Sequence, residues 1–151
     1  MDRSILIQYA DMKEEIKDLR RRITKLEEQI RRIEEEGAVS DVVKGGMGGT
    51  QHFTIKGFPN REYHHKKSLL MSRKLKLQMK ETELLELTGQ VEEYINSMES
   101  SELRMMFRFY YLDGLTWAQV AVRMNSHFPK RKIQYTDENC RQKNKRFFEK
   151  I

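Results

Sequence analysis

The chain has 151 residues, of which 38% are hydrophobic and 34% charged, and its formal net charge at pH 7 is +6. This size suits one compact unit with elongated helices and excludes a large enzyme core. A single cysteine excludes an internal disulfide framework, and no apolar run is long enough for a membrane span or a secretory signal, so we expect a cytoplasmic protein of a bacterial cell without membrane contact.

The first 36 residues carry an uninterrupted heptad pattern. Apolar residues alternate at steps of four and three over four heptads: Ile5, Tyr9, Met12, Ile16, Leu19, Ile23, Leu26, Ile30 and Ile33. This a/d seam predicts a long coiled-coil helix. Because so narrow a seam is not buried in a lone helix, the helix needs a partner.

Residues 62–98 form a second helical pattern. Its heptad positions hold Leu70, Leu77, Leu84, Val91 and Met98. Charged residues interrupt the second seam position early on, so this helix is an imperfect partner for the first. Whether the seam closes as an intrachain antiparallel hairpin or between copies stays open. We favour both, with the hairpin packing against a second copy as a homodimer.

The segment between these patterns, residues 38–60, is rich in glycine and contains Pro59. Residues 41–44 and 53–56 alternate enough to predict two short strands joined by the glycines. Residues 1–98 are therefore expected to be a coiled-coil oligomerisation region with a β-hairpin inserted at 38–60.

Residues 99–151 predict three short helices. Ser100 or Ser101 is a suitable N-cap for the first helix, which Asp113-Gly114 ends with a left-handed glycine. Thr116 is positioned to cap a second helix, and Thr136 to cap a third through the amides of residues 138 and 139. Cys140 falls on the inner side of the third helix and is expected to be a buried small hydrophobe.

The basic residues concentrate in the same region. Residues 123–150 hold nine Lys or Arg against three acids, a net charge of +6 that equals the charge of the whole chain. Basic charge on one segment is what a DNA-binding surface needs, because neutralised phosphates release counterions. With Ala121 at a helix crossing and a basic last helix, the pattern predicts a helix-turn-helix. The fold expected is mostly α: a long coiled-coil hairpin with a β-hairpin tip, then this domain.

Two stretches carry a family resemblance. The run Tyr110-Tyr111-Leu112-Asp113-Gly114-Leu115-Thr116-Trp117-Ala118-Gln119-Val120-Ala121 resembles the opening of the helix-turn-helix in region 4 of sigma-70-type factors. The last helix is similar to that family's apolar residue followed by basic residues, with Cys140 followed by Arg141, Lys143 and Arg146. The segment 125–135 is longer than in a typical sigma factor, and Gln119 stands where the family often has Glu.

Chain size and the upstream residues Ser40-Asp41-Val42-Val43-Lys44-Gly45 and Phe53-Thr54-Ile55-Lys56-Gly57 resemble phage late-gene transcriptional activators of the ArpU and RinA type. The resemblance implies a sequence-specific regulator that reads the major groove of double-stranded DNA with the helix at 136–150. The expected DNA-binding residues are Thr116, Lys130, Arg131, Lys132, Glu138, Asn139, Arg141, Gln142, Lys143, Lys145 and Arg146. Glu138, Asn139 and Gln142 are placed for base edges, and the basic residues mainly for phosphates.

Catalysis is not indicated. The Gly-rich run 45–50 lacks the Gly-Lys-Ser/Thr ending of a phosphate-binding loop, and adjacent His64 and His65 point in different directions on a helix. We therefore expect no enzyme, no cofactor and no metal site. Two alternatives remain: a small terminase subunit for phage DNA packaging, and a sigma-like module that contacts host RNA polymerase without reading DNA.

Overall fold

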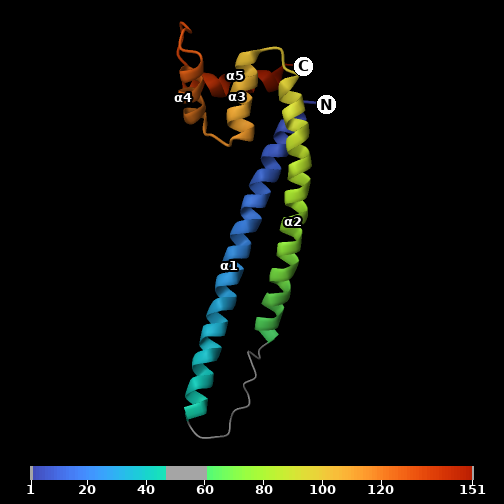
Figure 1. Ribbon diagram of the computed structural model, residues 1–151, viewed down its shortest axis with the longest axis vertical. Helices are drawn as coiled ribbons and strands as arrows, with labels where there is room; N and C mark the ends of the chain where they lie inside the picture. The colour runs from blue at the N-terminus through green and yellow to red at the C-terminus, as the bar shows by residue number, and fades with distance from the viewer. Residues whose placement is uncertain (1, 47–60, 151) are drawn as a thin grey trace. The chain divides into compact units, whose positions relative to one another are not determined.

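The computed structural model describes the backbone of residues 2–46 and 61–150, and the side chains of 2–37 and 61–150 (Figure 1). The first two elements are α1 (Ser4–Gly46) and α2 (Arg61–Asn96). Next come α3 (Ser101–Phe107), the π-helix η2 (Arg108–Leu112), α4 (Trp117–His127) and α5 (Asp137–Glu149). The described residues are helical or lie in the connections between helices, which confirms the mostly α class.

The chain divides into two compact units. The first unit consists of Met1–Lys13 and Glu83–Ile151, and the second consists of Glu14–Thr82. Both ends of the chain thus belong to the first unit, and the second unit is an insertion in its sequence.

Within the second unit, α1 and α2 pair as an antiparallel hairpin. Lys80 pairs with Glu15 at 2.9 Å, Lys74 with Glu27 at 3.0 Å, and Tyr63 donates a 2.8 Å hydrogen bond to Glu34. Of the seam residues of α1 in this unit, Ile16, Ile23, Leu26 and Ile30 are buried, and Leu19 and Ile33 are partly buried. The predicted seam is therefore satisfied within one chain, because α2 covers it.

One face of α2 in the second unit stays uncovered. Met71, Leu75 and Met79 recur every fourth residue, so they lie on one side of the helix, and each is more than half exposed. An open hollow of about 290 Å³ beside them is lined by the stems of Lys67 and Lys74. This apolar row is not explained by packing within the described chain.

The first unit has a core to which every one of its helices contributes. Ile5, Leu6 and Tyr9 of α1 and Leu87, Val91 and Ile95 of α2 are buried together with residues of the C-terminal helices and of the connection before α5: Met106, Phe107, Phe109, Tyr111, Val120, Ala121, Met124, Tyr135 and Cys140. Arg3 also donates a 2.7 Å hydrogen bond to the carbonyl of Phe147. The C-terminal helices are thus packed onto the start of α1 and the end of α2.

The predicted β-hairpin requires a correction. The backbone of residues 41–44 is helical, because α1 continues to Gly46. Once a helix has formed, each added residue gains a backbone hydrogen bond, and four alternating residues do not outweigh that gain. Gly37 also lies within α1, although a glycine in a helix interior lowers helix stability by about 1 kcal/mol relative to alanine. The second expected strand, residues 53–56, lies outside the described residues.

Candidate nucleic-acid interface

The turn that leads into α4 is built from local backbone requirements. The amide of Asp113 donates to the carbonyl of Arg108 at 2.9 Å, which is the wide spacing of the π-helix η2. Gly114 then takes a positive φ of 70°, as expected for a helix-ending glycine. This geometry stacks Tyr110 on Trp117, with ring centroids 3.8 Å apart and planes 10° apart. The sequence predicted the glycine turn but not the π-helix.

Both α4 and α5 begin with a complete capping box. Thr116 accepts a hydrogen bond from the amide of Gln119, whose side chain accepts from the amide of Thr116. Thr136 and Asn139 make the same reciprocal pair at the start of α5. Thr116 and Thr136 are confirmed as N-caps, but Thr136 caps only the amide of residue 139, because the amide of Glu138 donates to the Asp137 carboxylate at 2.9 Å. Each capping box fixes the first residue of its helix, and with it the angular position of every side chain that follows.

Helices α4 and α5 meet through small and unbranched side chains. Ala121 and Met124 of α4 and Cys140 of α5 are buried in one cluster, with Phe147 packed against it. The predicted burial of Cys140 is confirmed, and its apolar surroundings raise the pKa of its thiol. With Cys140 facing inward, residues one, five and six positions later face away from the core, namely Arg141, Lys145 and Arg146, and all three are exposed.

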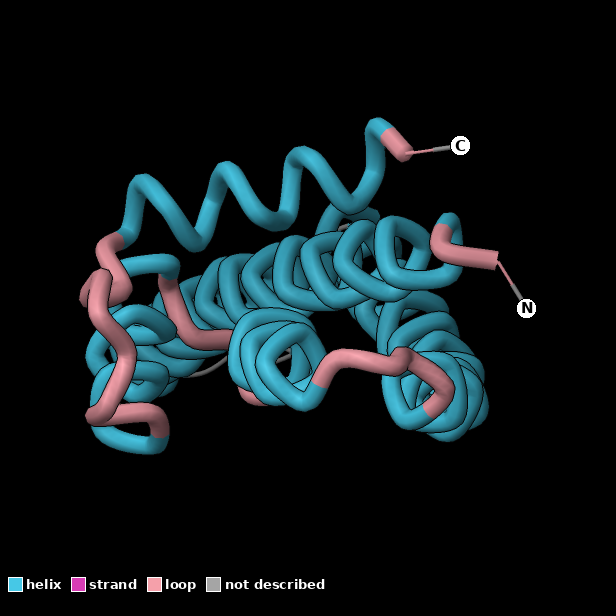
Figure 2. Tube along the Cα trace, turned by 90° about the horizontal axis from the view of Figure 1, so that it is seen from above, coloured by secondary structure: helices cyan, strands magenta, loops and turns pink. Residues whose placement is uncertain are grey.

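The side chain of Asn125 closes the base of the connection from α4 to α5. Asn125 donates from Nδ2 to the carbonyl of Tyr135 at 2.9 Å, and its Oδ1 accepts from the amide of Tyr135 at 2.8 Å. Tyr135 is itself buried. The nine residues between them therefore form a closed loop with a fixed base, and the part of it that follows α4 is the pink segment that precedes α5 in Figure 2.

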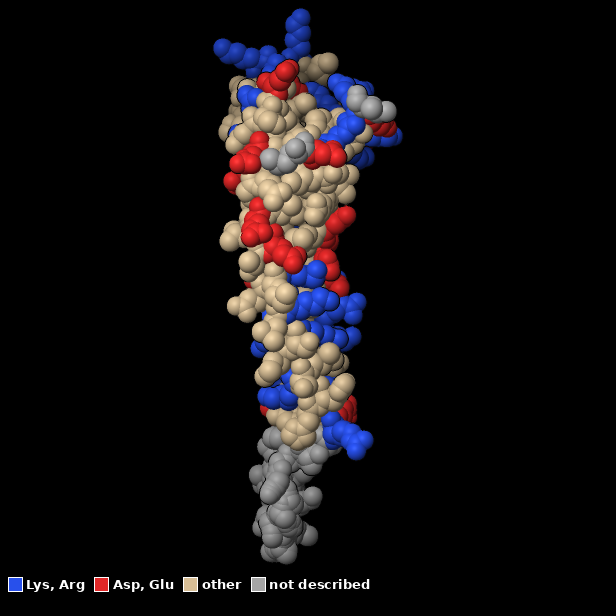
Figure 3. All heavy atoms as spheres, turned by 90° about the vertical axis from the view of Figure 1, so that its right-hand side faces the viewer, with Lys and Arg blue, Asp and Glu red and all other residues tan. Residues whose placement is uncertain are grey.

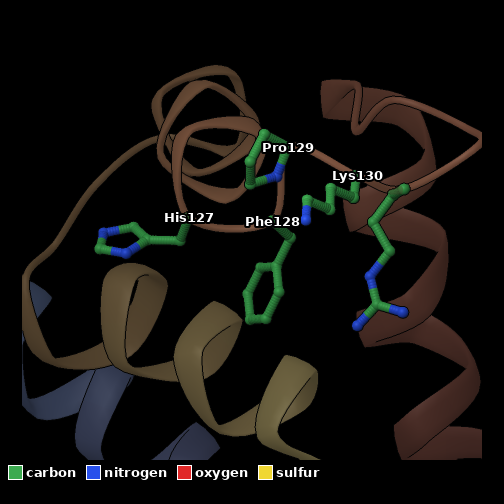
Figure 4. A pocket seen from close by; sticks show the side chains of 5 residues that line it. His127, Phe128, Pro129 and Lys130 are labelled. Atoms are coloured by element: carbon green, nitrogen blue, oxygen red, sulfur yellow. The ribbon is translucent and has the colours of Figure 1, made fainter.

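An open hollow of about 340 Å³ lies against this loop, lined by residues 127–131. Figure 4 shows Phe128 pointing toward the helices beneath the loop, Pro129 lying above it, and the side chain of Lys130 directed back toward Phe128. The guanidinium of Arg131 lies 5.3 Å from the centre of the Phe128 ring. Phe128 and Arg131 thus anchor this part of the loop to the unit.

Glu102 of α3 binds two of the predicted DNA-binding cations. It forms an ion pair with Lys143 and lies 3.6 Å from Arg131. Burial raises the pKa of the Glu102 carboxyl. The hydrogen bond from Lys143 and its positive charge oppose this effect, and the pKa of Glu102 is lowered overall. Lys143 also lies 5.3 Å from the centre of the Tyr135 ring. The sequence did not reveal this role of Glu102, because 41 residues separate it from Lys143.

The outer face of α5 carries a small polar network. Glu138 accepts from Arg141 at 3.1 Å and from Gln142 at 3.2 Å. Arg141 also lies 3.5 Å from Asp137. Asn139, in contrast, uses its side chain for capping and for a 3.0 Å hydrogen bond to the carbonyl of Gln134. The structure thus brings Glu138, Arg141 and Gln142 together on the first two turns of α5.

The remaining predicted residues are exposed and weakly engaged. Lys145 lies 4.0 Å from Glu149. Within the described parts of the chain, no ion pair is recorded for Lys130, Lys132 or Arg146. Figure 3 shows basic side chains projecting from the end of the first unit that carries α3, α4 and α5, and further Lys and Arg along the second unit.

Comparisons with protein-family models, with curated proteins and with solved structures found no match. The residues and their geometry therefore carry the functional argument. Among the described residues, no group of three His, Cys, Asp or Glu is placed to hold a metal ion. No helix in the described ranges is long and apolar enough to span a bilayer.

Proposed function

We propose that the chain is a sequence-specific DNA-binding transcription regulator, with α4 and α5 as a helix-turn-helix. One observation carries the proposal: α5 is fixed by its capping box and by Cys140, and it turns Arg141, Lys145 and Arg146 toward solvent. A rigid helix with a buried inner side and a basic outer side matches what a recognition helix needs in a major groove.

In this proposal the outer side of α5 divides into two functions. Gln142, Arg141 and Glu138 on the first two turns contact base edges, and their mutual hydrogen bonds exchange for bonds to bases. Lys145 and Arg146 contact phosphates, and the N-terminus of α4 at Thr116 adds a phosphate contact through its free amides. The base contacts provide specificity, and the phosphate contacts provide most of the affinity.

Two residues expected at DNA receive a supporting role instead. Lys143 already pairs with Glu102, so a phosphate contact would require breaking that ion pair. The side chain of Asn139 is committed to the start of α5. We propose that both position the helix rather than touch DNA, whereas Arg131 is shared between Glu102 and the loop.

The resemblance to phage activators of the ArpU and RinA type leads us to propose activation of late genes in the bacterial cytoplasm. Host RNA polymerase is then a further partner. A small terminase subunit is the second candidate, because it also combines a helix-turn-helix with helical oligomerisation segments. Light scattering separates the two: a terminase subunit forms a ring of many copies, whereas the regulator is a dimer.

We further propose that the homodimer forms through the exposed row of Met71, Leu75 and Met79 on α2. The α1 seam is already buried against α2, so the second copy has to bind elsewhere in the helical region. A dimer would present two copies of α5 to two half-sites and raise the affinity by their linkage.

The proposed function is tested with the full chain and duplexes that it selects from a random-sequence pool. Binding should weaken steeply with salt, and Arg146→Ala should reduce the slope of log K against log[salt] by roughly one unit. Arg31→Ala, which removes the same charge from an exposed position of α1, should leave the slope unchanged. Lys143→Ala should also leave it unchanged, because its charge is used inside the protein.

Specificity requires a separate measurement. Gln142→Ala should cost about 1–3 kcal/mol on the selected duplex and little on random DNA. Equal losses on both would show that Gln142 does not read a base. Failure of the full chain to bind or enrich any duplex would reject DNA reading and favour the polymerase-binding module.

A further inference from the structure

The α4–α5 loop carries Lys130, Lys132 and Ile133, which we call its crest. Packing within the unit does not explain this composition. Ile133 is 79% exposed, the largest exposed fraction among the exposed large hydrophobic residues of the described chain. Exposed Lys132 directly precedes Ile133 and exposed Lys130 lies three positions before it, and residues 128–136 contain no acid. An exposed isoleucine that directly follows a run of basic residues gains nothing from the fold, so its placement calls for a partner that is both apolar and anionic.

The loop holds this crest in one place. Its base is closed by the paired hydrogen bonds between Asn125 and Tyr135. Its lower part is anchored by Phe128 and by Arg131, whose amide donates to the carbonyl of Phe128 at 3.4 Å and whose side chain reaches Glu102. Because these anchors restrict the loop before binding, less conformational entropy is lost when the crest contacts a partner.

The crest also lies close to the start of α5. Thr136, the N-cap of α5, is three positions after Ile133, and three extended residues span at most about 10 Å. When α5 occupies a major groove, the neighbouring minor groove is about half a helical turn away, or roughly 17 Å. The span of these residues, extended by their side chains, is of the same order as that distance.

We propose that this loop is a wing that enters the minor groove beside the major groove read by α5, with Ile133 inserted against or between base pairs. The inference rests on the proposed function and adds a second groove to it. Lys130 and Lys132 lie along the phosphates at the two sides of the groove, where the potential is most negative. Ile133 contacts the apolar sugar walls and unstacks a base step, as apolar wedges do in minor-groove binders.

A contact to phosphates alone would use the two lysines and leave Ile133 in water. A minor groove supplies both the anionic edges and the apolar interior, so it uses all three residues. Insertion of the wedge bends the duplex toward the major groove. The duplex bound to the protein should therefore be bent. The protein should also prefer flexible pyrimidine–purine steps at positions that α5 does not contact.

The test uses the full chain and a duplex that it selects from a random-sequence pool. Dimethyl sulfate methylates guanine N7 in the major groove and adenine N3 in the minor groove, so one reagent reports on both contacts. The wild type should protect guanine N7 at the core of the site and adenine N3 beside it, and circularly permuted fragments should migrate as bent DNA.

Ile133→Ser should abolish the bend and lower the affinity roughly tenfold, while protection of guanine N7 persists. Lys130→Ala with Lys132→Ala should remove the adenine N3 protection. Val122→Ser is the matched control, because Val122 is 70% exposed on α4 and should change neither readout.

The outcomes separate the two hypotheses. No protection in either groove rejects the proposed DNA reading itself. Protection of guanine N7 with a straight duplex, or a bend and adenine N3 protection that survive Ile133→Ser, overturns the wing while the recognition helix stands. Normal DNA behaviour combined with loss of a protein contact in Ile133→Ser would assign the crest to a protein partner and also overturn the wing.

Discussion

Replacing Asn125 by Ala tests whether one side chain fixes the base of the α4–α5 loop. The substitution removes two hydrogen bonds, of 2.9 and 2.8 Å, to the carbonyl and the amide of Tyr135. Because Tyr135 is buried, these backbone groups are poorly placed to find water in exchange. At about 1 kcal/mol for each bond and a further penalty for unsatisfied groups, the first unit should lose about 2–3 kcal/mol.

Urea unfolding followed by tryptophan fluorescence measures this loss locally. Trp117 is the only tryptophan and is stacked on Tyr110 in the same unit. With an m value of about 1.5 kcal/mol/M, the midpoint should fall by roughly 1.5 M. Asn125→Asp keeps the acceptor for the Tyr135 amide and loses the donor, so it should be less destabilising than Asn125→Ala. Ser126→Ala, at an exposed neighbouring position, is the control.

A loss below about 0.5 kcal/mol in Asn125→Ala would refute this reasoning, since that is the range of ordinary surface substitutions. It would mean that water replaces the side chain, and that the loop is not fixed at its base. The preorganised wing would then lose its main structural support.

Two further predictions concern Glu102 and the exposed face of α2. The folded-state pKa of Glu102 is lowered, so its contribution to stability is present above its unfolded pKa and lost as the pH falls through the folded value. Glu102→Gln should therefore destabilise the first unit at neutral pH, and its difference from wild type in the free energy of unfolding should shrink on acidification. A difference that stays constant with pH, or the same behaviour in Glu99→Gln, would contradict this. Replacing Met71 and Leu75 together by Asp should yield a monomer with unchanged helix content, because both side chains are exposed within one chain. Sedimentation checks this against Val122→Asp, and a wild type that is already monomeric would reject the dimer.

The sequence predicted those features that depend on neighbours along the chain. The caps at Ser100, Thr116 and Thr136 and the left-handed Gly114 were predictable, because each satisfies or redirects backbone groups within four residues. The seam of α1 was also predictable, because a seven-residue repeat specifies one buried face whatever covers it.

Features that depend on distant residues were not predictable. Its charge and the family resemblance placed Lys143 among the phosphate contacts, whereas its ion pair with Glu102 of α3 requires the folded arrangement. The paired hydrogen bonds of Asn125 likewise need Tyr135 ten residues later, across a loop of no regular pattern. At residues 41–44 a short alternation indicated a strand, and the continuing helix α1 prevailed.

The interleaved order of the two units has a consequence for how this protein tolerates change. The first unit buries Ile5, Leu6 and Tyr9 beside Leu87, Val91 and Ile95, so a fragment starting at residue 99 would expose that apolar surface to water. The hydroxyls of Thr88 and Tyr9, 3.5 Å apart, show that the two helices are neighbours where the second unit is inserted. A short turn of about 2–8 residues between Lys13 and Glu83 would therefore close the first unit by itself. Whole heptads of the hairpin can then be lost or gained in evolution while the core under α5 is conserved.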